Sequence, residues 1–144
     1  MSILNVTRGT VLADRETWAV SAADRTRGLL DHDRLDAGEG LVISPCNSVH
    51  MFGMRFALDV VFVDKQDRVV RTIENLQPMG FTRIYLSAKR VIELPVGTIG
   101  ASRTEPGDQL ELSDAPEHPA GDWIVLWAIV VTALALTYFI IFFI

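Results

Sequence analysis

The 144-residue sequence lacks most of the features that would assign it to a chemical class at once. It has one cysteine, Cys46, so no disulfide can form within the chain, and this usage fits a reducing compartment. Neither GxGxxG nor GxxxxGK[ST] occurs, which leaves nucleotide binding through those loops unsupported. The N-terminus has no basic region followed by an apolar stretch, so it is not typical of a signal peptide.

A surplus of basic residues is also missing. The formal net charge is −5, and nucleic-acid binding requires a basic face, so we expect no nucleic-acid partner. Arg83, Lys89 and Arg90 lie close together in the sequence and leave a local basic patch open. A solvated strand and turn is the simpler interpretation of these three residues.

Charge is absent from the last 22 residues, Trp123 to Ile144. As a helix this run would span roughly 33 Å, enough to cross a bilayer core of about 30 Å. The sequence therefore predicts a single C-terminal membrane span as one partner of the chain. Because no signal for export precedes it, we expect a cell-membrane protein whose N-terminal domain faces the cytoplasm.

The remainder has the size of one compact domain with a single core. We predict a globular domain over residues 1–113, a linker rich in proline and glycine over 114–122, and the membrane helix over 123–144. Many short apolar stretches separated by turn residues predict a mainly β or α+β fold, a sandwich or partly open barrel with one short helix.

The expected elements are one capped helix, a central hairpin and several shorter pieces. Ser21 followed three residues later by Asp24 predicts a helix over residues 22–30. The β-branched and aromatic run at 60–63, the turn at 64–67 and the return at 69–73 predict the hairpin. Further strands are expected at 41–43, 84–86, 90–94 and 109–112, and one helical turn at 97–101.

Four stretches together resemble the prokaryotic family of unknown function called DUF192, or UPF0127. They are Arg27-Gly28-Leu29-Leu30, Gly38-Glu39-Gly40-Leu41, the run from His50 to Asp64, and Glu93-Leu94-Pro95-Val96-Gly97-Thr98. Ala57 and Val96 depart from the family pattern, which usually has proline and alanine there. The resemblance implies a compact, mostly β fold with one short helix; it implies no activity.

Two common kinds of catalytic or metal site are poorly supported. Cys46, His50 and Asp59 supply zinc-ligand types, but there is no second cysteine, CxxC or histidine pair, so we expect no metal and no cofactor. Ser44 or Ser48 with His50 and Asp59 supplies the residue types of a hydrolase triad, yet the GxSxG elbow is missing. A buried cysteine and a half-buried histidine are the simpler interpretation.

The most suggestive set is Arg55, Asp59 and Glu93. If the segment stays extended, Arg55 and Asp59 project to the same face, although Gly53 favours a bulge. Charged groups beside an apolar wall are typical of a small-ligand pocket. The alternative is an ion pair that closes one end of the barrel. The apolar wall would be formed by Met51, Phe52, Met54 and Phe56.

Two functions remain open from the sequence. The first is a membrane-tethered module that binds a small ligand or a protein partner. The second is an enzyme that uses Asp59 as a general acid or base at the membrane surface. The absence of a recognisable nucleophile, metal set or cofactor motif favours the first. We further expect Asp59 to be buried and stabilising, paired with Arg55 or with Arg90 across the sheet.

Overall fold

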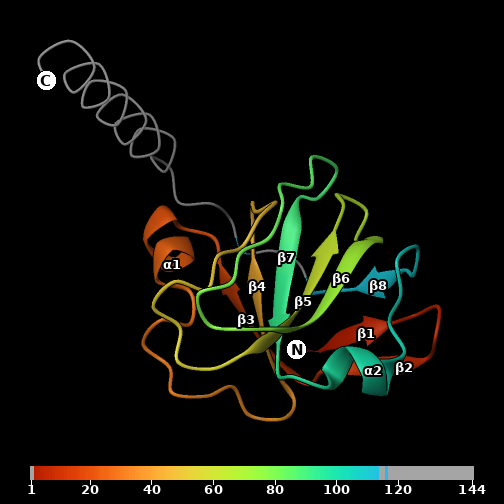
Figure 1. Cartoon of the computed structure of the whole chain (residues 1–144). Helices are drawn as coiled ribbons and strands as arrows, with labels where there is room; N and C mark the ends of the chain where they lie inside the picture. The colour runs from red at the N-terminus through yellow and green to blue at the C-terminus, as the bar shows by residue number, and fades with distance from the viewer. Residues whose placement is uncertain (1, 114–115, 117–144) are drawn as a thin grey trace, which may run out of the picture.

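The computed structural model describes residues 2–113 and residue 116 (Figure 1). The predicted membrane segment, 123–144, and most of the predicted linker lie outside the described residues, so both stay predictions. Within the described part of the chain, no helix is long and apolar enough to cross a membrane.

Two sheets and two short helices make up the domain, as the strand-rich prediction requires (Figure 1). The smaller sheet has the order β2-β1-β8, with β1 at Ile3–Asn5, β2 at Thr10–Ala13 and β8 at Leu110–Glu111. The larger sheet has the order β3-β4-β7-β5-β6. Its strands are β3 (Arg15–Ala19), β4 (Glu39–Ile43), β5 (Leu58–Val63), β6 (Val69–Leu76) and β7 (Arg90–Leu94). Only β3 and β4 pair in parallel within it; the other neighbours are antiparallel.

The predicted local signals are confirmed for the hairpin and the first helix. Strands β5 and β6 form the antiparallel hairpin around the expected turn. Helix α1 (Ala22–Arg27) begins where Ser21 accepts a hydrogen bond from the Asp24 N–H at 3.0 Å. It ends earlier than expected because Gly28 takes a φ of +47°, which breaks the helix. Helix α2 (Thr98–Ser102) occupies the predicted helical turn.

The larger sheet is buried on both faces, which explains the unbroken apolar run of β5. Val61 and Val63 pack with the small sheet and α2 in one core cluster. Val60 and Phe62 point the other way, into a second cluster. The domain therefore has three layers: the small sheet, the large sheet, and a cover over the second face.

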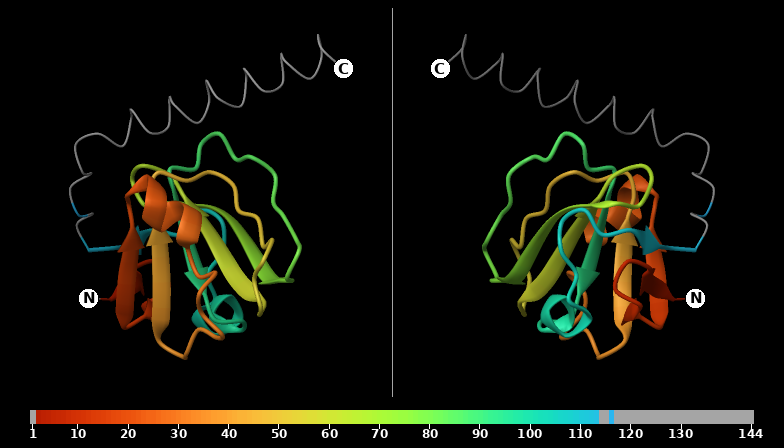
Figure 2. Two further views of the ribbon diagram at one scale, coloured as in Figure 1. Left: turned by 90° about the vertical axis from the view of Figure 1, so that its left-hand side faces the viewer. Right: turned by 90° about the vertical axis from the view of Figure 1, so that its right-hand side faces the viewer.

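That cover is built from α1 and two long loops. We call the two loops, 44–57 and 77–89, the loop layer. The two loops run side by side in Figure 2 and are joined by backbone hydrogen bonds. Thr82 N–H donates to Val49 O at 2.9 Å, and Tyr85 N–H donates to Asn47 O at 2.9 Å. The predicted strand at 84–86 is wrong: this segment belongs to the loop layer, where only scattered bonds replace a strand ladder.

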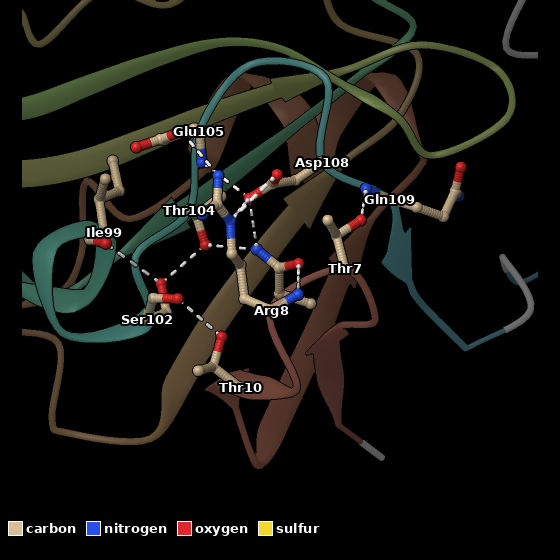
Figure 3. A network of polar contacts seen from close by, with 10 residues as sticks. Thr7, Arg8, Thr10, Ile99, Ser102, Thr104, Glu105, Asp108 and Gln109 are labelled. Carbon is tan, nitrogen blue, oxygen red and sulfur yellow. Dashed lines mark hydrogen bonds and ion pairs between the residues drawn. The ribbon is translucent and has the colours of Figure 1, made fainter.

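A polar network fixes the small sheet to the loop before β8 (Figure 3). The Asp108 carboxylate accepts from the Asn5 side chain at 2.9 Å and from Arg8 Nε at 3.0 Å. It also accepts from the Glu105 N–H at 3.0 Å. Burial opposes the charged form of Asp108, but the hydrogen bonds from Asn5 and Arg8 outweigh it, so the pKa of Asp108 is lowered.

Candidate functional site

A pocket of about 460 Å³ lies between α1, the end of β4, the first loop of the loop layer and β7. Its volume falls within the range of small-ligand sites, about 300–1,000 Å³. Apolar groups form much of the wall, among them Leu29, Ile43 and Met54. Polar and charged groups also line it: Arg25, Thr26, Arg27, Cys46, Ser48, His50 and Glu93.

Glu93 is the buried charged group of this pocket. It lies on β7, the central strand of the large sheet, where it pairs with Leu41 of β4 and Val60 of β5. Only 6% of the residue is exposed, and no described residue donates a hydrogen bond or forms an ion pair with its carboxylate. Burial without a compensating partner disfavours the charged form and raises the pKa of Glu93 to about 7.

Cys46 lies close enough to Glu93 to be influenced by its charge. The thiol donates to the Ser48 carbonyl at 3.1 Å and is half-buried. Burial raises the pKa of the Cys46 thiol, and the negative charge of Glu93 adds to this effect. Because the reactive form of cysteine is the thiolate, Cys46 is placed as a wall of the pocket and not as a nucleophile.

Helix α1 contributes positive charge to the same pocket. The Arg25 guanidinium donates to the Val20 carbonyl at the start of the helix, which fixes its position. Its charge acts on Cys46 in the direction opposite to that of Glu93, lowering the thiol pKa. The lining of the pocket thus includes a buried carboxyl and a guanidinium from different elements.

Asp59 does not belong to this pocket. It is fully buried on the other face of the large sheet, because β5 alternates and Asp59 shares the side of Val61. Its carboxylate accepts from three backbone N–H groups: Asn75 at 2.9 Å, Gly97 at 3.1 Å and Ile99 at 2.9 Å. The expected burial is confirmed, but the expected arginine partner is wrong. Asp59 instead binds the turn that begins α2.

The predicted set of Arg55, Asp59 and Glu93 is therefore not assembled. Arg55 is exposed and pairs with Asp33, because residues 50–57 form turns and not the extended strand that the alternation argument assumed. Arg90 pairs with Asp67. The apolar wall is divided as well. Met54 lines the pocket, Phe56 packs against the second core cluster, Met51 is fully buried and Phe52 points to solvent.

The zinc and triad hypotheses fail on the same geometry. His50 and Cys46 both line the pocket, but Asp59 lies across the sheet and cannot join them. Over the residues that the structure describes, no group of three histidine, cysteine or acidic side chains is placed to hold a metal. The Ser–His–Asp set lacks its acid for the same reason.

The family model DUF192, described as "Uncharacterized ACR", matches residues 5–112. The chain belongs to the DUF192 family. A "UPF0127 protein" of Thermococcus sibiricus is 30% identical over 122 residues, covering 82% of this chain and 79% of that protein.

Two solved structures share the fold of this DUF192 domain. A protein of unknown function from Novosphingobium aromaticivorans has a TM-score of 0.67 at 22% identity, covering 77% of this chain and 82% of that one. A putative transcription regulator from Sinorhizobium meliloti has a TM-score of 0.64, also at 22% identity, covering 76% and 89%. These likenesses establish the strand-rich two-sheet fold and assign no function.

Sequence reasoning identified Glu93 and Met54 as site residues and named Cys46, Ser48 and His50 only for other kinds of site, but it missed Arg25 and Thr26. Arg25, Thr26 and Ser48 carry no recognisable spacing relative to Glu93, because the loop layer and α1 bring them together only in three dimensions. One signal was present. A glutamate in the apolar strand 90–94 is unusual, because an unpaired buried carboxyl is costly.

Proposed function

We propose that this DUF192 domain is a small-ligand binding module whose ligand occupies the pocket above Glu93. The observation that carries the proposal is a nearly buried carboxyl that faces a pocket and has no partner among the described residues. A ligand that donates to this carboxyl would supply the missing hydrogen bonds. Without such a ligand, burial of a carboxyl that has no hydrogen-bond partner lowers the stability of the domain.

The chemistry of the pocket favours a small molecule that carries an amine. A cationic amine pairs with the ionised form of Glu93 and is small enough for a cavity of about 460 Å³. Thr26 and Ser48, which also line the pocket, can accommodate a second, polar group of the same molecule. A ligand with both features would be held at its two ends.

Ligand screening at two pH values tests this proposal. Residues 1–113, which contain every described strand and helix, would be melted with panels of small amines, polyols and carboxylic acids. Because Glu93 titrates at about 7, amine affinity should rise roughly tenfold between about pH 6 and about pH 8. Glu93→Gln should abolish binding, whereas Glu74→Gln, on the exposed part of β6, should leave it intact. Amine binding that survives Glu93→Gln would contradict the proposal.

A second candidate is general acid–base chemistry at the same residue. A carboxyl that titrates near pH 7 can both accept and donate a proton under physiological conditions. Turnover of a bound ligand, lost in Glu93→Gln, would distinguish this function from binding alone. Asp59 does not support the enzymatic alternative, because its carboxylate is fully buried and already accepts three backbone N–H groups.

The uncharged run at 123–144 supports tethering of this module to the cell membrane. For residues 1–113 we propose the cytoplasmic side. Protease added to spheroplasts should then leave the domain intact. Digestion from outside would reverse the proposed orientation.

A further inference from the structure

The loop layer has one face against the large sheet and one face turned outward. Inward-pointing side chains include Met51, which is fully buried, and Tyr85, whose ring lies 4.7 Å from that of Phe62. The outward face carries large apolar side chains that contact no core cluster. They are Phe52 (48% exposed), Met79 (66%), Phe81 (73%), Ile84 (65%) and Leu86 (82%).

Contacts between the two loops hold these apolar side chains in place. His50 and Phe81 form an isolated antiparallel bridge between the two loops, and the His50 ring stacks on Phe52 at 5.2 Å. Met79 N–H donates to Met51 O at 3.0 Å. The backbone therefore holds the outward apolar side chains away from the core. Only contact with a second surface can remove them from water.

The two loops themselves carry charge of one sign, although Arg55 and Arg90 at their ends pair with Asp33 and Asp67 of neighbouring segments. Residues 40–58 and 75–92 contain no aspartate or glutamate, although the whole chain has a net charge of −5. Arg83 and Lys89 lie on the same loop as Phe81, Ile84 and Leu86; both are exposed, and no described residue forms an ion pair with either. An exposed apolar surface whose own loops carry basic residues and no acids is complementary to a membrane surface that contains anionic lipids.

We infer that the outer face of the loop layer rests on an anionic lipid bilayer, with Ile84 and Leu86 in its interfacial region. The length of chain beyond the domain permits this contact. Residues 114–122 can span about 30 Å when extended, comparable to the width of a domain this size. The inference is independent of the ligand proposal, since Glu93 faces the interior side of the same layer.

Labels at two exposed apolar positions test the contact in the full chain. Leu86→Cys and Val11→Cys, each in a Cys46→Ser background, would carry an environment-sensitive fluorophore. Val11 is the matched control, because it is 56% exposed but lies on β2, beyond the opposite face of the large sheet. The protein would be reconstituted in vesicles containing nitroxide-labelled lipids, with and without phosphatidylglycerol. The label at position 86 should be quenched, and more strongly with phosphatidylglycerol; the label at position 11 should not.

Charge reversal tests the electrostatic part. Arg83→Glu and Lys89→Glu should each lower the ratio of quenched to unquenched label at position 86 by roughly fivefold or more. Arg103→Glu changes the net charge equally but lies at the exposed end of α2, beyond the opposite face of the large sheet, so it should have little effect.

Equal quenching at positions 86 and 11, or none at either, would overturn the inference. It would also be overturned if the label at 86 stayed in water in lipid vesicles and became shielded only in native membranes. That result would assign the surface to a protein partner.

Discussion

Replacing Glu93 with glutamine should stabilise the domain above neutral pH and leave it unchanged in acid. The folded pKa of Glu93 is raised from an ordinary value of 4.5 to about 7, so the folded state holds its proton more tightly than the unfolded state. The contribution of Glu93 to stability is therefore greatest below about pH 4.5 and falls as the pH rises to about 7. At about 1.4 kcal/mol per pKa unit, the loss amounts to about 3 kcal/mol, a penalty that glutamine does not incur.

The assay is urea denaturation of residues 1–113 over a range of pH, with wild type, Glu93→Gln and the exposed control Glu74→Gln. The difference in unfolding free energy between Glu93→Gln and wild type should grow from near zero at about pH 4 to about 3 kcal/mol at about pH 8. Contributions from all other titrating groups cancel in this difference. A difference that does not change with pH would refute the reasoning, because it would mean that Glu93 ionises freely in the folded domain.

Three further predictions concern other parts of the chain. Asp59→Asn should cost about 3 kcal/mol in the same assay, because an amide group would place a donor against backbone N–H donors; an unchanged midpoint would remove Asp59 from its structural role. Asp108 has a lowered pKa, so its stabilising effect is present above its ordinary pKa and is lost as the pH falls through the folded value. Asp108→Asn should therefore weaken the domain at neutral pH and reduce its loss of stability in acid, as urea midpoints at about pH 7 and about pH 3 would show. Alkaline carbonate should leave the full chain with the membrane pellet, while residues 1–113 alone stay in the supernatant; release of the full chain would contradict the membrane span.

Much of the fold is predictable because its signals are local. The Ser21 cap, the turn between β5 and β6, and the apolar run of β7 each depend on residues a few positions apart. The segment 84–86 shows the limit of such signals. Its alternation of outward Ile84 and Leu86 with inward Tyr85 has the period of a strand, but its backbone hydrogen bond to Asn47 is isolated and does not continue into a strand ladder.

The site was less predictable because it depends on which face of the sheet each side chain occupies. Asp59 and Glu93 lie on adjacent strands, and the register that pairs Asp59 with Leu94 sends the two carboxyls to opposite faces. Sequence alone does not give this register. Arg55 was misplaced for a related reason: the strand begins only at Leu58, so the alternation could not be extended back to it.

The most direct test of the ligand proposal is an NMR titration of the Glu93 side-chain carboxyl in residues 1–113, without and with the amine selected by screening. The structure predicts a pKa of about 7 in the free domain and a lower pKa in the complex, because a bound cation favours the ionised carboxylate. An ordinary pKa in the free domain, unchanged by the amine, would contradict the proposal that Glu93 is a buried carboxyl whose missing hydrogen bonds are supplied by the ligand.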